Sequence, residues 1–386
     1  MCEPNTTKRA VTHVSLPSMT PGNVRTITVH RFGESGAKPK VYLQAGLHGN
    51  EHPGLLVLHH LLRNLDTLSK KGSITGQFVI VPLVNPIGLS QFIHGELVGR
   101  FDFFSGHNFN RDFPNMVDAV AARIVGQLSE SAEENQAMVR KVALEILGSR
   151  KEINESAEMR RLIMLMAMDA DIAIDLHADG QSLLHCYTHP CHKGLADELG
   201  AQLGAEAILL GADREAYSFD DTLNLFWVDL AERFPDKPLP PACFAATIEL
   251  RGRIDVVDVL AKRDADNLIR FFMRRGAISG DPGPLPPLKT EIAKPLNAVY
   301  HGRAPASGVA VFHKKLGDWV KSGEIVADIV DPAAEHIDQA RHPVASATDG
   351  LFFSQNLVKF VRAGQTFFKI AGNRVLNDRQ TGFLED

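Results

Sequence analysis

The stretch Lys40–Glu51, KVYLQAGLHGNE, carries two signals of an α/β fold within one short segment. Its first part, Lys40–Gln44, is rich in apolar residues and predicts a buried strand, and the residues after Glu51 predict a helix over Pro53–Leu65. Open α/β sheets place their ligands beyond the carboxyl ends of strands. The turn Ala45–Glu51 therefore predicts where a functional site lies as well as what kind of fold surrounds it.

Strands and helices continue to alternate along the chain. Further strands are predicted at Gln77–Val84, Asp171–His177 and Ala245–Leu250, and further helices at Met116–Gly148, Ala157–Met168 and His192–Leu203. The stretch Met116–Gly148 is rich in Ala, Glu, Gln and Arg, which favours an amphipathic pair of helices that covers the domain. This pattern is typical of an α/β domain with a mixed sheet between two helix layers.

A change in composition predicts a domain boundary. The sequence ISGDPGPLPP at Ile278–Pro287 is rich in Gly and Pro, which end helices and favour an extended connection. We therefore expect an α/β domain over residues 1–280, a linker over 281–293 and a β-rich C-terminal domain over 294–386.

The C-terminal region reads as a small all-β domain, because short β-like runs alternate there with Gly and Asp. Its Gly317–Gly323 turn and the following Ile325–Val330 run resemble the barrel-sandwich hybrid of biotinyl and lipoyl carrier domains. Those carriers present a modified Lys on the next turn, whereas Asp331 and Pro332 follow here. We expect a structural cap on the main domain and no swinging arm.

Composition excludes several classes of protein. The 386 residues include 41 Lys and Arg against 46 Asp and Glu, a net charge of −5 that argues against nucleic acid as a partner. No apolar block has the length of a signal peptide or a membrane span. Four Cys in a chain of this length do not form a disulfide framework. We expect a cytoplasmic protein without a membrane partner.

Three residues suggest a metal site. His48 and Glu51 lie on one turn, so that an imidazole nitrogen and a carboxylate oxygen can reach one ion at about 2.0–2.2 Å. His177 ends a predicted buried strand and is the candidate for the third ligand, although a lone His at a strand end is more often structural. Two His and one Glu are a typical catalytic zinc set with an open fourth position. We expect one Zn²⁺ per chain.

Glu249 ends another predicted strand, in an apolar environment. A buried carboxylate must be paired, coordinated or catalytic, since an unpartnered buried charge is costly. The structural alternative is a salt bridge to Arg251 or Arg253.

The Phe-rich segment RFDFFSGHNFNRDFP at Arg100–Pro114 suits an ordered loop with an Arg near either end. The guanidinium of Arg100 or Arg111 offers a planar set of donors for a carboxylate or a developing oxyanion. Either residue can instead be a solvated surface charge.

Four motifs in order carry a family resemblance. They are G-L-H-G-N-E at Gly46–Glu51, N-F-N-R-D-F-P at Asn108–Pro114, D-L-H at Asp175–His177 and T-I-E-L at Thr247–Leu250. Over roughly residues 25–275, the chain resembles the zinc carboxypeptidase superfamily. The G-x-H-G-N-E form is similar to that of its succinylglutamate desuccinylase and aspartoacylase branch.

The resemblance implies roles for seven residues: zinc ligands His48, Glu51 and His177, general base Glu249, substrate-carboxylate contacts Asn110 and Arg111, and Arg100 polarising the scissile carbonyl. The spacing from Arg100 to Arg111 is longer than in aspartoacylases, and the segment 115–168 is expanded. The resemblance also implies that the C-terminal β domain narrows access to small substrates. Asp175 either orients the imidazole of His177 or forms a buried salt bridge.

These observations favour a zinc-dependent amidohydrolase that removes an acyl group from a small N-acyl amino acid. The alternatives are a zinc metallocarboxypeptidase acting on short peptides and a non-catalytic ligand-binding protein. Asp220 and Asp221 could favour a substrate amine, although a solvated loop is the simpler interpretation of that segment. A homo-oligomer is left open.

Overall fold

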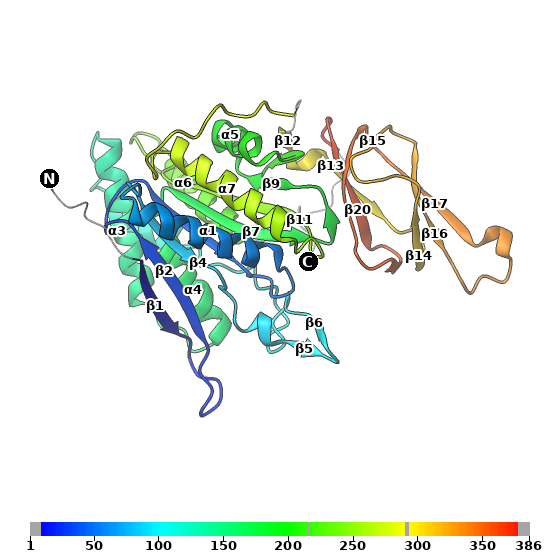
Figure 1. Cartoon of the computed structure of the whole chain (residues 1–386), viewed down its shortest axis with the longest axis horizontal. Helices are drawn as coiled ribbons and strands as arrows, with labels where there is room; N and C mark the ends of the chain where they lie inside the picture. The colour runs from blue at the N-terminus through cyan, green and yellow to red at the C-terminus, as the bar shows by residue number, and fades with distance from the viewer. Residues whose placement is uncertain (1–8, 213, 215–216, 290–292, 377–386) are drawn as a thin grey trace.

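The computed structural model describes residues 9–212, 214, 217–289 and 293–376 and consists of two units (Figure 1). The larger is an α/β unit built on a nine-stranded sheet, and the smaller consists of antiparallel sheets near the C-terminus. The predicted fold class is confirmed. Residues 290–292 of the predicted linker and 377–386 of the predicted C-terminal domain lie outside the described residues.

The large sheet is mixed. Its order is β1-β2-β4-β3-β7-β11-β9-β10-β12. The strands are β1 (Ala10–Ser15), β2 (Thr26–Phe32), β3 (Lys40–Ala45), β4 (Gln77–Val81), β7 (Ile172–Asp179), β9 (His185–Thr188), β10 (Ala207–Leu210), β11 (Phe244–Gly252) and β12 (Ala293–Pro295). The central strands β3, β7 and β11 are adjacent and parallel, so their carboxyl ends meet at one edge.

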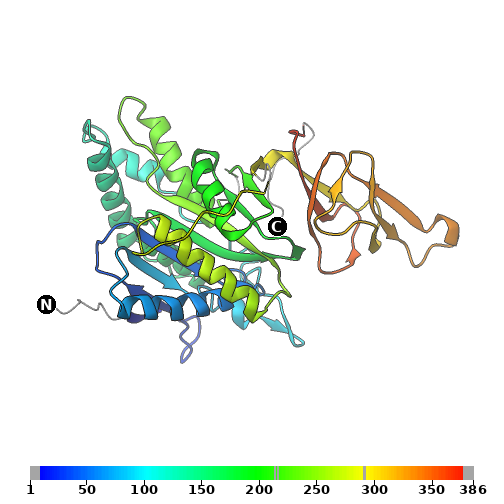
Figure 2. The same cartoon turned by 45° about the horizontal axis from the view of Figure 1, so that its top comes forward.

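Helices cover both faces of this sheet. One face carries α1 (Pro53–Lys70), α5 (Lys193–Leu203) and α7 (Asp258–Arg274), and the other carries α2 (Val117–Ile124), α3 (Ala132–Ser149), α4 (Glu155–Ala167) and α6 (Phe219–Arg233). In Figure 2, α1 and α7 lie side by side on the first of these faces. Each layer closes its own apolar core against the sheet, as expected for an α/β fold.

Helix α1 shows why the sequence folds in this way locally. Pro53 occupies the first turn, where its missing N–H costs nothing, and Val57, Leu61 and Leu65 recur at helical spacing and are buried. Gly54 lets the helix approach β7 closely, because a Cβ at this position would lie 2.8 Å from Leu176 Cβ. The helix that follows the candidate site is therefore fixed against the strand that carries His177.

The C-terminal unit is two packed sheets. One has the order β13-β20-β18-β15 and the other β17-β16-β14-β19. Their strands are β13 (Val299–Arg303), β14 (Gly308–Phe312), β15 (Trp319–Val320), β16 (Ile325–Val330), β17 (Arg341–Ala345), β18 (Gly350–Gln355), β19 (Phe360–Val361) and β20 (Thr366–Gly372). Buried residues such as Val326, Phe352 and Phe367 form its core.

A short strand of the α/β unit joins the two units. β8 (Gln181–Ser182), just after β7, pairs antiparallel with β18. A further hairpin of the α/β unit, β5 (Phe92–Ile93) with β6 (Glu96–Leu97), lies apart from the large sheet. Among the described residues, no helix is both long enough and apolar enough to cross a bilayer.

Candidate functional site

The turn after β3 holds two of the predicted ligands. Gly46 has φ +71°, a left-handed conformation that favours glycine, and it turns the chain away from the sheet. The amide of Asn85 donates to the carbonyl oxygen of Leu47 at 2.7 Å and so fixes the turn. His48 and Glu51 are buried as a result, with side chains 4% and 5% exposed.

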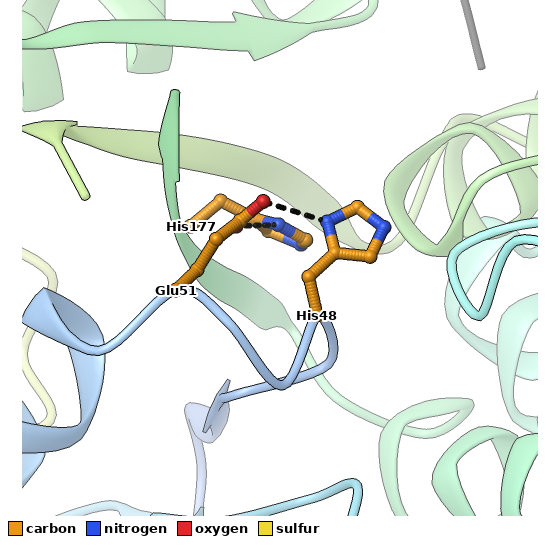
Figure 3. A group of neighbouring side chains, drawn as sticks. All are labelled: His48, Glu51 and His177. Atoms are coloured by element: carbon orange, nitrogen blue, oxygen red, sulfur yellow. Dashed lines mark hydrogen bonds and ion pairs between the residues drawn. The ribbon is translucent and has the colours of Figure 1, made fainter. Parts of the chain in front are cut away.

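His48, Glu51 and His177 converge on one point (Figure 3). His48 Nδ1 lies 2.9 Å from Glu51 Oε1, and His177 Nδ1 lies 2.8 Å from Glu51 Oε2. One ligand atom from each residue can be chosen so that all three lie within 4.8 Å of one another. The structure thus brings His177 to Glu51 across 126 positions of the chain, and His48 lies three positions before Glu51.

The other ring nitrogen of each histidine faces an oxygen acceptor. His48 Nε2 lies 2.8 Å from Asn108 Oδ1, and His177 Nε2 lies 2.8 Å from Asp175 Oδ2. Asn108 Oδ1 also accepts from the backbone N–H of Asn110, which identifies that atom as the amide oxygen. Both Nε2 atoms are therefore positioned to donate.

This arrangement fits a cation. A neutral imidazole that donates through Nε2 keeps a lone pair on Nδ1. Arg100 Nη1, which can only donate, lies 3.1 Å from His48 Nδ1, in agreement with a lone pair on that atom. Two imidazole nitrogens and a carboxylate facing one another are the donor set of a metal ion, and acceptors that fix the distal nitrogens are typical around metal-binding histidines.

The protonation of these groups follows their surroundings. Burial, with a further contribution from Arg100, lowers the pKa of His48 to about 4. Burial also lowers the pKa of His177, but Asp175 and Glu51 outweigh burial and raise it well above its ordinary value. Burial raises the pKa of Glu51, but the two histidines outweigh it and hold that pKa well below its ordinary value. Without an ion, Glu51 is therefore a carboxylate and His177 carries the compensating proton, which a bound cation would replace.

Arg100 lies at this cluster. Its Nη1 is 3.2 Å from Glu51 Oε1, and its side chain is 34% exposed. The guanidinium therefore borders the cluster and also faces the cavity. This position suits a donor to a carbonyl oxygen next to the three ligands.

Glu249 approaches from the neighbouring strand. It is the Cα partner of His177 across the β7–β11 pair, and it lines the same cavity as His48 and Glu51. Its Oε2 is buried without a hydrogen-bond partner. Burial, reinforced by Glu51, raises the pKa of the Glu249 carboxyl to about 8. An unpartnered carboxyl with a pKa near neutrality is suited to proton transfer.

The salt bridge considered for Glu249 does not form. Arg251 pairs with Asp264 on α7 instead. Among the described residues, neither Arg251 nor Arg253 forms an ion pair with Glu249. Arg251 has φ +65°, and the register between β7 and β11 shifts between Glu249 and Gly252, so its side chain leaves the strand pattern just beyond Glu249.

Asn110 and Arg111 line another part of the cavity. Asn110 is buried, and its Oδ1 accepts from the backbone N–H of Phe219 at 2.9 Å, which links this loop to the start of α6. Arg111 donates through Nη1 to the carbonyl oxygen of Asn110 at 2.8 Å. All seven predicted site residues thus line one cavity of about 390 Å³.

The C-terminal unit closes part of this cavity. Lys369 on β20 forms an ion pair with Asp179 at 3.0 Å, and Ser354 on β18 donates to the same carboxylate at 2.6 Å. Asp179 lies two residues after His177 on β7. Residues of the C-terminal unit, including His301, Asn356 and Lys369, line the cavity with the predicted ligands.

Sequence reasoning missed several of these contacts and misread one. Asn108 lies within one of the four motifs, but the sequence does not show that its Oδ1 faces His48 Nε2 and accepts from the backbone N–H of Asn110. Asp220 and Asp221 do not form a solvated loop: both are in the first turn of α6, buried, and line the cavity. The sequence carries a signal for the start of this helix, a Ser followed by two acidic residues. In the structure, Ser218 is the N-cap and its Oγ accepts from the backbone N–H of Asp221.

The described part of the chain contains one such group of three ligand-type side chains. Cys186 and His192 lie outside this group, in β9 and in a short 3₁₀ turn before α5. Burial raises the pKa of the Cys186 thiol to about 12, which disfavours the thiolate that binds metal.

Comparison with protein families agrees with the motifs. Residues 37–139 match the model of the succinylglutamate desuccinylase/aspartoacylase catalytic domain. This segment contains His48, Glu51, Arg100, Asn110 and Arg111, whereas His177 and Glu249 lie beyond it. None of the curated proteins matches the sequence.

Solved structures show the same fold over nearly the whole chain. A protein of Shewanella frigidimarina NCIMB 400 with a provisional succinylglutamate desuccinylase/aspartoacylase name has a TM-score of 0.82 at 22% identity, covering 95% of this chain and 98% of that one. The succinylglutamate desuccinylase/aspartoacylase of Rhodobacter sphaeroides has a TM-score of 0.66 at 16% identity, with 97% and 98% covered. The ectoine utilization protein EutE (DoeB) of Ruegeria pomeroyi has a TM-score of 0.65 at 16% identity, with 94% and 95% covered. The resemblance predicted from the motifs is confirmed.

Proposed function

We propose that this chain, which resembles the succinylglutamate desuccinylase/aspartoacylase family in sequence over residues 37–139 and in fold over nearly its whole length, is a zinc-dependent amidohydrolase of small N-acyl amino acids. One observation carries the proposal. The Nδ1 atoms of His48 and His177 converge on the Glu51 carboxylate while their Nε2 atoms face oxygen acceptors. The unpartnered Glu249 carboxyl beside them supports a hydrolytic role.

His48, Glu51 and His177 would hold the zinc ion. When bound, zinc lowers the pKa of a coordinated water towards about 7 and polarises a carbonyl group. Asp175 and Asn108 fix the two imidazole rings through their Nε2 atoms, so that both Nδ1 atoms point at the place where the ion would be held.

The chain's own groups supply the rest of the reaction. Glu249 accepts a proton from the attacking water as a C–O bond forms at the amide carbon. Arg100 donates an N–H to the carbonyl oxygen as negative charge develops on it. The C–N bond then breaks, and Glu249 returns its proton to the leaving nitrogen. Asn110 and Arg111 bind the carboxylate of the amino acid and hold the amide in place.

The proposal also retains the finer expectations: a domain division at residues 1–280, 281–293 and 294–386, a cytoplasmic location, and one zinc per chain. The shared fold and the contacts of the C-terminal unit with the cavity support a small substrate. A peptidase acting on short peptides would use the same ligands, so substrate choice decides between the two activities.

The test is a screen of zinc-loaded protein against N-acetyl and N-succinyl amino acids and short peptides. Release of the amino acid from the acyl substrates is the expected result. Glu249→Gln should keep the zinc but lose turnover, whereas Glu335→Gln, an exposed change in the C-terminal unit, should keep both. Cleavage of peptides alone would favour the carboxypeptidase, and absence of metal in folded protein would favour a binding protein.

A further inference from the structure

Asp175 is a fully buried carboxylate with one oxygen left unsatisfied. The residue is 0% exposed, and its Oδ2 accepts from His177 Nε2 at 2.8 Å. Its Oδ1 is also buried, but it has no hydrogen-bond partner among the described residues. Such an oxygen is costly, because it has lost its hydration without gaining a donor. A donor to Asp175 Oδ1 should therefore come from a residue beside it.

The sheet register shows which side chains lie beside this carboxylate. The Cα partner of Asp175 is Gln44 on β3 and Thr247 on β11. Opposed residues of neighbouring strands point to the same face of a sheet, and such strands are about 4.7–4.9 Å apart. The hydroxyl of Thr247 is hydrogen-bonded to Asp220 and is therefore committed elsewhere. Of the two neighbours, Gln44 remains as the donor.

The amide of Gln44 has an N–H end that matches this oxygen. Gln44 is 0% exposed, and its Oε1 accepts from the hydroxyl of Tyr42 at 2.8 Å. Burial, reinforced by Asp175, raises the pKa of Tyr42 well above its ordinary value, so the hydroxyl keeps the proton that it donates. The Nε2 atom of Gln44 is buried, and no residue that the structure describes accepts from it. An unused N–H of Gln44 and an unused oxygen of Asp175 therefore lie on opposed residues of adjacent strands.

Packing alone explains only one end of the Gln44 amide. Tyr42 satisfies Oε1, whereas a glutamine kept only to fill space would leave a buried N–H donor unsatisfied. The terminal torsions of Gln and Asp side chains have broad preferences. Rotation of the two side-chain ends can therefore close the contact without moving either strand, and one hydrogen bond then satisfies both buried atoms.

We propose that Gln44 is a positioning residue of the candidate metal site, whose amide N–H donates to Asp175 Oδ1 and holds that carboxylate against His177 Nε2. The series Tyr42–Gln44–Asp175–His177 then leads from the core to the Nδ1 atom that faces Glu51 (Figure 3). Gln44 itself does not line the cavity. The orientation of one candidate ligand thus depends on a residue that touches neither the ion nor the substrate. This inference rests on the proposed function for the zinc ion, but its tests need no turnover.

The first measurement is a high-resolution crystal structure of the unmodified, zinc-loaded protein. We expect Gln44 Nε2 and Asp175 Oδ1 to lie about 2.7–3.2 Å apart, the range of an N–H···O hydrogen bond. A separation above about 3.5 Å would overturn the proposal. So would an amide orientation in which Gln44 Oε1 faces Asp175, because two acceptors cannot bond to each other.

The second measurement is zinc affinity in a competitive chelator titration. Gln44→Met keeps the length of the side chain but removes the donor, and it should weaken zinc binding about tenfold, the lower end of the range for residues that support metal ligands. Gln202→Met is a matched control at a buried glutamine of α5, whose amide contacts Asn267 and Arg274 away from the cavity. It should leave zinc affinity unchanged. A Gln44→Met variant that loses stability as the control does but binds zinc like the parent would assign Gln44 to packing and contradict the proposal.

A double-mutant cycle tests whether Gln44 acts through Asp175. In an Asp175→Ala background, Gln44→Met should cause no further loss of zinc affinity, because the acceptor is already absent. A further loss of about tenfold in that background would show an independent effect and refute the positioning role. The crystal structure uses the unmodified protein, so it decides the question even where a variant does not fold.

These results are separable from the proposed function. If the protein binds zinc but cleaves no acyl compound, the hydrolase fails, and the zinc affinities still decide the role of Gln44. If acyl compounds are hydrolysed and Gln44→Met binds zinc as tightly as the parent, the positioning role fails and the hydrolase stands.

Discussion

Replacing Lys369 by Met tests how the C-terminal unit supports the site. The change keeps the length of the side chain but removes the ammonium that lies 3.0 Å from Asp179 Oδ2. Asp179 keeps its bonds from Ser354 Oγ and from the backbone N–H of Gly180. The carboxylate is then left inside the structure without its cation.

The magnitude follows from burial. Removing one partner of a fully buried ion pair costs about 3–5 kcal/mol, because the other charge remains desolvated. The side chains of Lys369 and Asp179 are 26% and 24% exposed, and two hydrogen bonds to Asp179 survive, so we expect about 2–3 kcal/mol. By comparison, Lys193→Met removes an exposed pair with Asp197 on α5 and should cost at most about 0.5 kcal/mol.

The effect should depend on pH. Burial raises the pKa of Asp179, but Lys369 and other groups outweigh burial and hold it well below its ordinary value. Burial lowers the pKa of Lys369, but Asp179 outweighs burial and raises it above its ordinary value. The pair therefore stabilises the fold between about pH 4 and pH 10, the unfolded pKa values, and the difference between variant and parent should shrink as pH falls below 4.

Urea unfolding followed by circular dichroism, at pH 7 and at low pH, measures these differences. A Lys369→Met variant as stable at pH 7 as the Lys193→Met control would refute the reasoning. So would a loss of stability that persists unchanged once Asp179 is protonated in the unfolded chain, because a packing defect would not follow that titration.

Three further predictions follow from the site and its supports. Asn108→Ala should weaken zinc binding about 10–100-fold by freeing the His48 ring, and Asn108→Asp, which keeps an oxygen acceptor, should restore most of the affinity in a competitive chelator titration. Gly54→Ala should destabilise the fold by about 1–3 kcal/mol because the new Cβ would lie 2.8 Å from Leu176 Cβ, whereas Gly148→Ala, in a helix with open space around it, should be neutral or stabilising in thermal unfolding. Burial lowers the pKa of His185 to about 4, so stability should fall between pH 6.5 and pH 4 as the unfolded chain takes up the proton first, and His185→Gln should lessen that slope; an unchanged slope would mean that other groups control it.

The strand-end residues could be predicted because their signal is local. The runs before Ala45, His177 and Glu249 are apolar enough to be recognised as buried strands, and parallel neighbours bring their carboxyl ends together. The helix Pro53–Leu65 was recognised by its periodicity and continues to Lys70. The candidate metal site could therefore be predicted from the residues at the ends of adjacent parallel strands.

The second set of contacts could not be predicted, since it depends on residues far apart in the chain. Asn108 meets His48 across 60 positions, and Lys369 meets Asp179 across 190. The edge strand β1, its neighbour β2 and the helices α6 and α7 were not anticipated, and without α6 the segment of Asp220 was interpreted as a solvated loop. Polar residues in such places acquire a role only when the tertiary fold buries them.

The residues that line the cavity thus come from two parts of the fold, and each set can change without the other. One edge comes from β7, β11 and the turn after β3, where a change of residue alters the candidate ligands themselves. Its opposite walls come from the start of α6 and from the C-terminal unit, where a change such as Asp220→Asn alters charge without touching the ligands. Under the proposed function, substrate preference can therefore change through the wall residues while the candidate ligands stay the same, and the motif G-L-H-G-N-E alone does not specify the substrate.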